Sequence, residues 1–84
     1  MRLQLQIYTR KNCCLCEEMK SVIRAAKAPF PITLDEIDVD SSAELQVLYG
    51  EKVPVLFING RKAFKYRVTA RELQERFERE KGGD

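Results

Sequence analysis

The chain has 84 residues, of which 44% are apolar and 33% are charged, as in an ordinary globular protein. Its 15 Lys and Arg residues nearly balance its 13 Asp and Glu residues, so the net charge of +2 does not indicate a nucleic-acid-binding protein. The absence of His excludes Ser–His and Cys–His nucleophile pairs and imidazole metal ligands. We expect one domain over residues 1–84.

The first half of the chain predicts a strand, a helix and a second strand. Apolar residues alternate with glutamines over residues 3–7, which is the period of a strand. Asn12 is a suitable N-cap, which makes Cys13 the first residue of a helix that ends before Pro29. Residues 32–39 predict the second strand. The apolar positions of the helix fall on one face: Leu15, Met19, Val22, Ile23 and Ala26.

A short helix follows the second strand. Ser41 and Glu44 form a capping box, and Asp40 is an alternative cap. Gly50 suits a left-handed residue at the helix end. The apolar residues of this helix are Leu45, Leu48 and Tyr49.

A hairpin and a last helix complete the pattern. Residues 53–58 and 61–66 predict antiparallel strands, joined by Asn59-Gly60, the preferred pair for a type I′ turn. Thr69 and Glu72 form a capping box for a helix that buries Leu73 and Phe77 and ends near Gly82-Gly83. The order βαβαββα predicts an α/β fold, with one mixed four-stranded sheet and three helices.

The three cysteines lie within four residues, as Cys13, Cys14 and Cys16. Cys13 and Cys16 form a C-x-x-C pair at the predicted start of a helix, where free N–H groups and the helix dipole favour a thiolate. The basic residues Arg10 and Lys11 add positive charge beside them. We therefore expect thiol–disulfide exchange, with Cys13 as the attacking thiolate and Cys16 as the resolving thiol.

Other interpretations of the cysteines compete with exchange. A zinc site needs about four ligands, and the sequence offers neither a second cysteine pair nor a histidine, so we expect no metal site. Cys14 is an accessory thiol, either a second acceptor for exchange or simply a small side chain. A Cys13–Cys14 disulfide requires a strained ring, which favours the second view of Cys14.

The order of these motifs resembles the thioredoxin superfamily, and most closely the glutaredoxins and their glutaredoxin-like bacterial relatives. The resemblance rests on Tyr8-Thr9, the C-x-x-C, Val53-Pro54 and the sequence of residues 57–60, Phe-Ile-Asn-Gly. It implies a thioredoxin-like fold, a cis Val53–Pro54 bond beside the cysteines, and backbone groups of Val53 that pair with an extended substrate.

The sequence also departs from the glutaredoxin pattern. Cys14-Leu15 replaces the usual Pro-Tyr or Pro-Phe, and Phe-Lys-Tyr-Arg at residues 64–67 replaces the Gly-Gly and Asp that hold glutathione. If Arg67 takes the place of the aspartate, it repels the glutathione ammonium. Arg10 matches a basic residue that meets a glutathione carboxylate. We expect Arg10, Lys11, Val53 and Pro54 to bind substrate, and no tightly bound cofactor, with glutathione held weakly.

The expected protein is a thiol–disulfide oxidoreductase whose partners are a disulfide-containing protein or small-thiol substrate and a reducing partner. Two alternatives are a thioredoxin-fold binding module without turnover and an iron–sulfur or metal carrier formed by a bridged dimer. No apolar run approaches the roughly 20 residues of a membrane span, and residues 1–10 lack the apolar core of a secretory signal. We therefore expect a cytoplasmic monomer without membrane or nucleic-acid partners.

Overall fold

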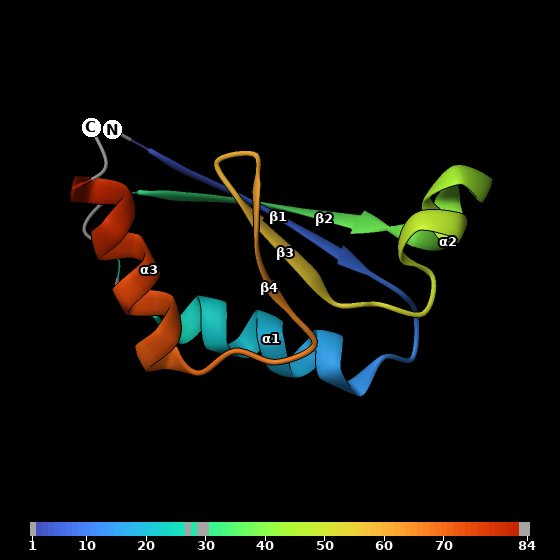
Figure 1. Cartoon of the computed structure of the whole chain (residues 1–84). Helices are drawn as coiled ribbons and strands as arrows, with labels where there is room; N and C mark the ends of the chain where they lie inside the picture. The colour runs from blue at the N-terminus through green and yellow to red at the C-terminus, as the bar shows by residue number, and fades with distance from the viewer. Residues whose placement is uncertain (1, 27, 29–30, 83–84) are drawn as a thin grey trace.

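The computed structural model of the chain describes residues 2–26, 28 and 31–82 and has the expected element order (Figure 1). A single turn of 3-10 helix, η1, precedes α2. The elements are β1 (Leu3–Thr9), α1 (Cys14–Ala25), β2 (Ile32–Asp38), η1 (Val39–Ser41), α2 (Ala43–Tyr49), β3 (Val55–Ile58), β4 (Arg61–Lys65) and α3 (Ala70–Gly82). The α/β fold with one mixed sheet and three α-helices is confirmed.

The four strands form one sheet in the order β2-β1-β3-β4. β1 pairs in parallel with β2, and β3 is antiparallel to both β1 and β4. Tyr8 lies opposite Val55, and Val55 lies opposite Lys65. Because of this register, the end of β1, the start of β3 and the end of β4 lie at one edge of the sheet.

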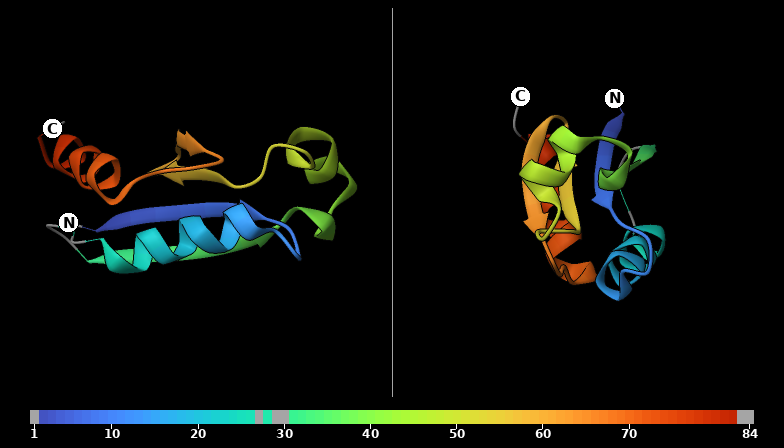
Figure 2. Two further views of the ribbon diagram at one scale, coloured as in Figure 1. Left: turned by 90° about the horizontal axis from the view of Figure 1, so that it is seen from below. Right: turned by 90° about the vertical axis from the view of Figure 1, so that its right-hand side faces the viewer.

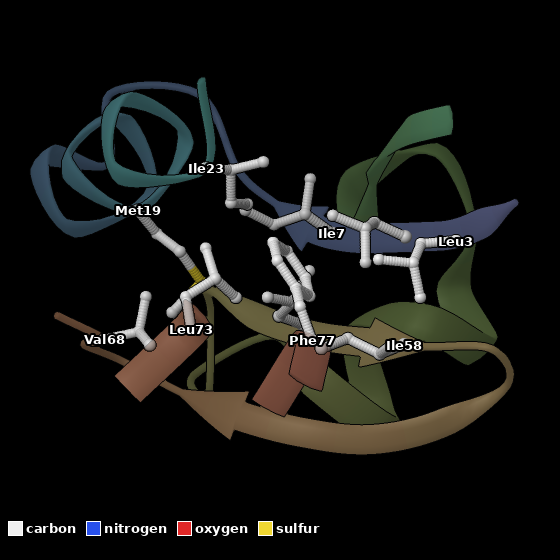
Figure 3. Close-up of a cluster of buried hydrophobic side chains, with 10 residues drawn as sticks. Leu3, Ile7, Met19, Ile23, Ile58, Val68, Leu73 and Phe77 are labelled. Atoms are coloured by element: carbon white, nitrogen blue, oxygen red, sulfur yellow. The ribbon is translucent and has the colours of Figure 1, made fainter. Parts of the chain in front are cut away.

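The main core lies between the sheet and the two longer helices. α1 and α3 cover the same face of the sheet, as Figures 1 and 2 show. The alternating apolar residues of β1 point into this core, where Phe77 of α3 is fully buried among side chains of β1, β3 and α1 (Figure 3). The buried members of the cluster are Leu3, Leu5, Ile7, Met19, Ile23, Leu56, Ile58, Val68, Leu73 and Phe77.

The opposite face of the sheet is covered in part by α2, at the end of the sheet where β1 stops. The ring of Tyr49 lies 4.6 Å from that of Tyr8, and Tyr8 meets Phe57 edge-on at 5.4 Å. Leu48, expected to be an apolar contact of this helix, is instead 50% exposed. The short helix α2 therefore packs against the sheet mainly through the aromatic contacts of Tyr49.

The ends of α2 differ from the predicted caps. Ser42 is the N-cap and its hydroxyl accepts a hydrogen bond from Leu45, so the capping box assigned to Ser41 and Glu44 is wrong. Ser41 belongs to η1, which Asp38 caps through the N–H of Asp40, so Asp40 is not the cap either. The 3-10 turn moves the start of α2 by one residue.

Gly50 does not adopt the left-handed conformation predicted for it. Its φ of −51° and ψ of −36° are right-handed helical values. A Cβ atom at this position would lie 2.5 Å from the carbonyl oxygen of Gln46, which explains a glycine there without a positive φ. The carbonyl of Gly50 instead accepts a hydrogen bond from Arg10.

The hairpin and the last helix follow the sequence closely. Asn59 and Gly60 have φ values of 50° and 83°, as a type I′ turn requires. The Thr69 hydroxyl accepts from the Glu72 N–H, and the Glu72 carboxylate accepts from the Thr69 N–H, which confirms the capping box.

The predicted strands are shortened in three places. The second strand ends before Val39, which stays buried but belongs to η1. The third strand begins at Val55 rather than residue 53, and the fourth ends at Lys65 because Tyr66 has a positive φ. None of the helices in the described residues combines the length and the apolar character needed to cross a membrane.

Candidate active site

Cys13 and Cys16 form a disulfide in the structure, with their Cα atoms 5.2 Å apart. Cys16 is fully buried on the core side of α1, whereas Cys13 is partly exposed. Cys13 also lines an open pocket at the surface, whereas Cys16 does not. The two cysteines of the pair therefore differ in burial.

Cys13 is the N-cap of α1 and not its first residue, so the cap assigned to Asn12 is wrong. Asn12 has a φ of 58° and occupies the turn before the helix, whereas an N-cap residue needs an extended backbone. Cys13 has that backbone, and its Sγ accepts a hydrogen bond from the Cys16 N–H at 3.1 Å. The sulfur thus takes the position that a capping oxygen usually fills.

Cys14 is the first residue of α1, and its side chain is exposed and free. It stands at the rim of an open pocket of about 580 Å³ beside the N-terminus of the helix. The pocket is lined by Thr9, Arg10, Lys11, Asn12, Cys13, Cys14, Glu17, Lys20 and Asp38. The structure therefore brings both predicted basic residues and two of the three cysteines to one hollow.

Arg10 already has partners within the chain. Its guanidinium pairs with the Asp40 carboxylate at 3.2 Å and donates to the Gly50 carbonyl at 2.9 Å. These contacts tie the end of β1 to η1 and α2. Lys11 is exposed and forms no ion pair within the part of the chain that the structure describes, so its ammonium is available to an anionic ligand.

Lys20 lies against the pocket between two carboxylates, an arrangement that the sequence analysis missed. Its ammonium pairs with Glu17 on the same helix and with Glu36 on β2, the latter at 2.8 Å. The hydrogen bonds that the Lys20 ammonium donates to the two carboxylates raise the pKa of Lys20, and the hydrogen bond and charge of Lys20 lower the pKa of Glu17. The i,i+3 spacing of Glu17 and Lys20 on a helix was the available signal.

The Val53–Pro54 peptide bond is cis, as the resemblance implied. It immediately precedes β3, at the edge of the sheet where β1 ends. There the chain continues into the cysteine loop, residues 10–13, which joins β1 to α1. Pro54 is buried, and its carbonyl accepts a hydrogen bond from the Tyr66 N–H at 2.8 Å. Val53 and Pro54 do not line the pocket beside Cys14, so that edge and the pocket are separate surfaces next to the cysteine loop.

Comparison with known proteins decides the family. The family described as glutaredoxin-like domain (DUF836) matches residues 4–78. The chain belongs to this glutaredoxin-like family. A glutaredoxin-like protein of Dictyostelium discoideum, the YDR286C homolog, is 31% identical over 77 residues, covering 84% of this chain and 71% of that protein.

Several solved structures are also similar in fold to this glutaredoxin-like chain. Protein Ne2328 of Nitrosomonas europaea is 30% identical, with a TM-score of 0.72 over 89% of this chain and 91% of that one. Protein XcR50 of X. campestris is 27% identical, also at a TM-score of 0.72, over 88% and 95% of the two chains. A thioredoxin of Halobacterium salinarum, 24% identical with a TM-score of 0.58 over 90% of this chain and 72% of its own, shares the fold. The thioredoxin-like fold is thereby confirmed.

Proposed function

We propose that the protein is a dithiol oxidoreductase that reduces disulfides through Cys13 and Cys16. The observation that carries the proposal is the arrangement of the cysteine pair. Cys13 is partly exposed and its sulfur caps a helix, and Cys16 is buried at disulfide distance from it. A pair that served only to stabilise the fold would gain little, because it closes a loop of very few residues.

The reaction consists of two exchange steps. The thiolate of Cys13 attacks one sulfur of a substrate disulfide RS–SR′, forms a mixed disulfide with the RS group and releases R′S⁻, which takes a proton from solvent. The thiolate of Cys16 then attacks the Cys13 sulfur and releases RS⁻, which is protonated in turn. The substrate gains two electrons and the protein becomes the Cys13–Cys16 disulfide.

Residues around Cys13 support each step. The Cys16 N–H points at the Cys13 sulfur, and a hydrogen bond to the charged form favours the thiolate. The exposed ammonium of Lys11 adds positive charge near the same loop. Among the described residues, the backbone N–H and C=O of Val53 form no hydrogen bond, which leaves them free to pair with an extended substrate.

The proposal includes a reducing partner that returns the disulfide to two thiols. A dithiol protein is the donor that we favour, because Arg67 stands in the stretch of the sequence where glutaredoxins usually carry the aspartate that holds glutathione. We propose no resident cofactor. In the described residues no group of three or more His, Cys, Asp or Glu side chains is placed to hold a metal ion.

A coupled assay tests the function. The protein is supplied with a small disulfide and with glutathione plus glutathione reductase, or with thioredoxin plus its reductase. We expect turnover with the dithiol system that is lost in Cys13→Ser. The variant Cys16→Ser should accumulate a mixed disulfide on Cys13, seen as added mass that a reductant removes. If wild type and Cys13→Ser are equally inactive with every donor, the binding-module alternative replaces this proposal.

A further inference from the structure

Tyr66 has a backbone conformation that tyrosine rarely adopts. Its φ of 69° lies in the left-handed region, where a bulky side chain is an outlier and glycine is the usual residue. The N–H of Arg67 donates to the carbonyl of Lys65 at 2.8 Å, an i to i+2 bond around Tyr66. A residue with a positive φ that is enclosed by such a hydrogen bond forms the rare, strained type of γ-turn.

Tyr66 is not a core residue. Tyr66 is 39% exposed, whereas Val68, two residues later, packs in the core close to Met19 (Figure 3). The chain therefore holds an exposed tyrosine in a conformation that a glycine would adopt with less strain. Strain of this kind concentrates at ligand-binding sites, and an observed outlier is a reason to look for one.

Tyr66 lies at the end of the sheet from which the chain leads on to Cys13. Its N–H is bonded to the carbonyl of Pro54, so it stands next to Val53 at the sheet edge where β1 ends. The loop after β4 also runs alongside α1 on its way to α3, as Figures 1 and 2 show. A molecule whose sulfur reaches Cys13 and whose backbone pairs with Val53 would extend over this ring.

Two positively charged residues flank Tyr66 in the chain. The ammonium of Lys65 lies 5.2 Å from the centre of the Tyr66 ring, and Arg67 follows directly. Within the described residues neither Lys65 nor Arg67 has a carboxylate within 4 Å, so both charges are unneutralised. An aromatic surface with two unpaired cations is complementary to a polypeptide that carries Asp or Glu beside an apolar group.

We propose that Lys65, Tyr66 and Arg67 form a docking surface for the acidic segment that flanks the target disulfide. This inference rests on the proposed oxidoreductase function and names its substrate class: an extended acidic polypeptide. Tyr66 supplies apolar contact area beside Val53, and the two cations select the sign of the charge. Edge strands also carry lysines to discourage aggregation, but that role gives no reason for a strained, exposed tyrosine.

The test uses three disulfide peptides of equal length whose cysteine is flanked by acidic, uncharged or basic residues. A small uncharged disulfide, bis(2-hydroxyethyl) disulfide, measures the chemistry without a flanking segment. We expect kcat/KM of wild type to be about tenfold higher for the acidic than for the basic peptide at low salt, and the difference to shrink as salt is added. Equal rates on all three peptides would overturn the inference.

Matched variants assign the effect to residues. Lys65→Gln/Arg67→Gln should reduce the acidic preference to about twofold or less, whereas Arg2→Gln/Arg61→Gln, with the same loss of charge at the other end of the sheet, should retain it. Tyr66→Gly keeps the left-handed backbone and removes the ring. We expect this variant to unfold at the same or a higher temperature, yet to lose more activity on peptides than on the small disulfide. A lower unfolding temperature with an equal loss on all substrates would make Tyr66 a structural residue only.

A binding measurement separates the two proposals. Fluorescence anisotropy with the same peptides carrying Ser in place of Cys reports docking without chemistry. Binding of the acidic peptide without turnover of any disulfide would retain the docking surface and overturn the oxidoreductase function. Turnover of the small disulfide, together with equal binding of the three peptides, would retain the oxidoreductase function and overturn the docking surface.

Discussion

The backbone N–H of Cys16 points at the sulfur of Cys13 from 3.1 Å, so the buried member of the pair supports the accessible one before any chemistry begins. A thiolate on Cys13 keeps this hydrogen bond and gains the favourable field at the start of α1. No equivalent donor is directed at the exposed Cys14 in the described part of the chain.

In the reduced protein, Cys13 should react with limiting iodoacetamide before Cys14 and Cys16. Cys16 is shielded by burial, and Cys14 lacks the hydrogen bond that Cys13 receives. The measurement is peptide mapping by mass spectrometry after alkylation over a pH series that begins near pH ~6. Earlier labelling of Cys14 would show that the nucleophile has been assigned to the wrong residue.

Oxidation should leave one free thiol, on Cys14. The Cys13–Cys16 pair has a Cα separation within the usual disulfide range, whereas adjacent residues form a strained ring. The variant Cys14→Ser should keep disulfide reduction within a few-fold of wild type, and Cys13→Ser should abolish it. Thiol counting on the oxidised proteins serves as the control. Complete inactivity of Cys14→Ser would make Cys14 a member of the catalytic set.

Arg67→Asp should strengthen the binding of glutathione. Arg67 is exposed and unpaired in the described residues, and its charge opposes the ammonium of glutathione if the ligand occupies the family's usual position. For exposed charges the gain should be roughly 0.5 to 2 kcal/mol, measured by titration calorimetry. Arg61→Asp changes the net charge equally at the far end of β4 and should have a smaller effect. Tight and equal binding by wild type and Arg67→Asp would place Arg67 outside the site.

Lys20→Met should raise the pKa of Glu17 toward its ordinary value. The hydrogen bond and the charge of Lys20 hold that pKa down in the folded protein. A lowered folded-state pKa adds stability above the ordinary pKa and loses it as the pH falls through the folded-state value. Lys20 has a raised pKa in the folded protein. Its contribution to stability is therefore present below its ordinary pKa and is lost as the pH rises through the raised pKa.

Carbon-13 NMR of the Glu17 carboxyl, titrated in wild type and Lys20→Met, measures this shift. The stability difference between the two proteins should be greatest near neutral pH and smaller in acid. Lys62→Met removes the same charge from exposed β4 and should leave the Glu17 titration unchanged. An unchanged Glu17 titration in Lys20→Met would contradict the contact.

The sequence alone determined the order of the elements and the cysteine pair. Alternation in β1, the Asn59-Gly60 turn and the Thr69–Glu72 capping box are local signals, and each depends on residues within a few positions of one another. The spacing of Cys13 and Cys16 likewise sets their distance once a helix begins there. These features could be predicted because neighbouring residues decide them.

The tertiary structure decided what depends on residues far apart in sequence. Cys13 caps α1 in place of the predicted Asn12, because the path of the chain out of β1 gives Asn12 a positive φ. Arg10 meets Asp40 and Gly50 only because η1 and α2 pack at the end of β1. The strained turn at Tyr66 exists because the pairing of β3 with β4 brings its N–H to the carbonyl of Pro54, a contact that no short stretch of sequence could specify.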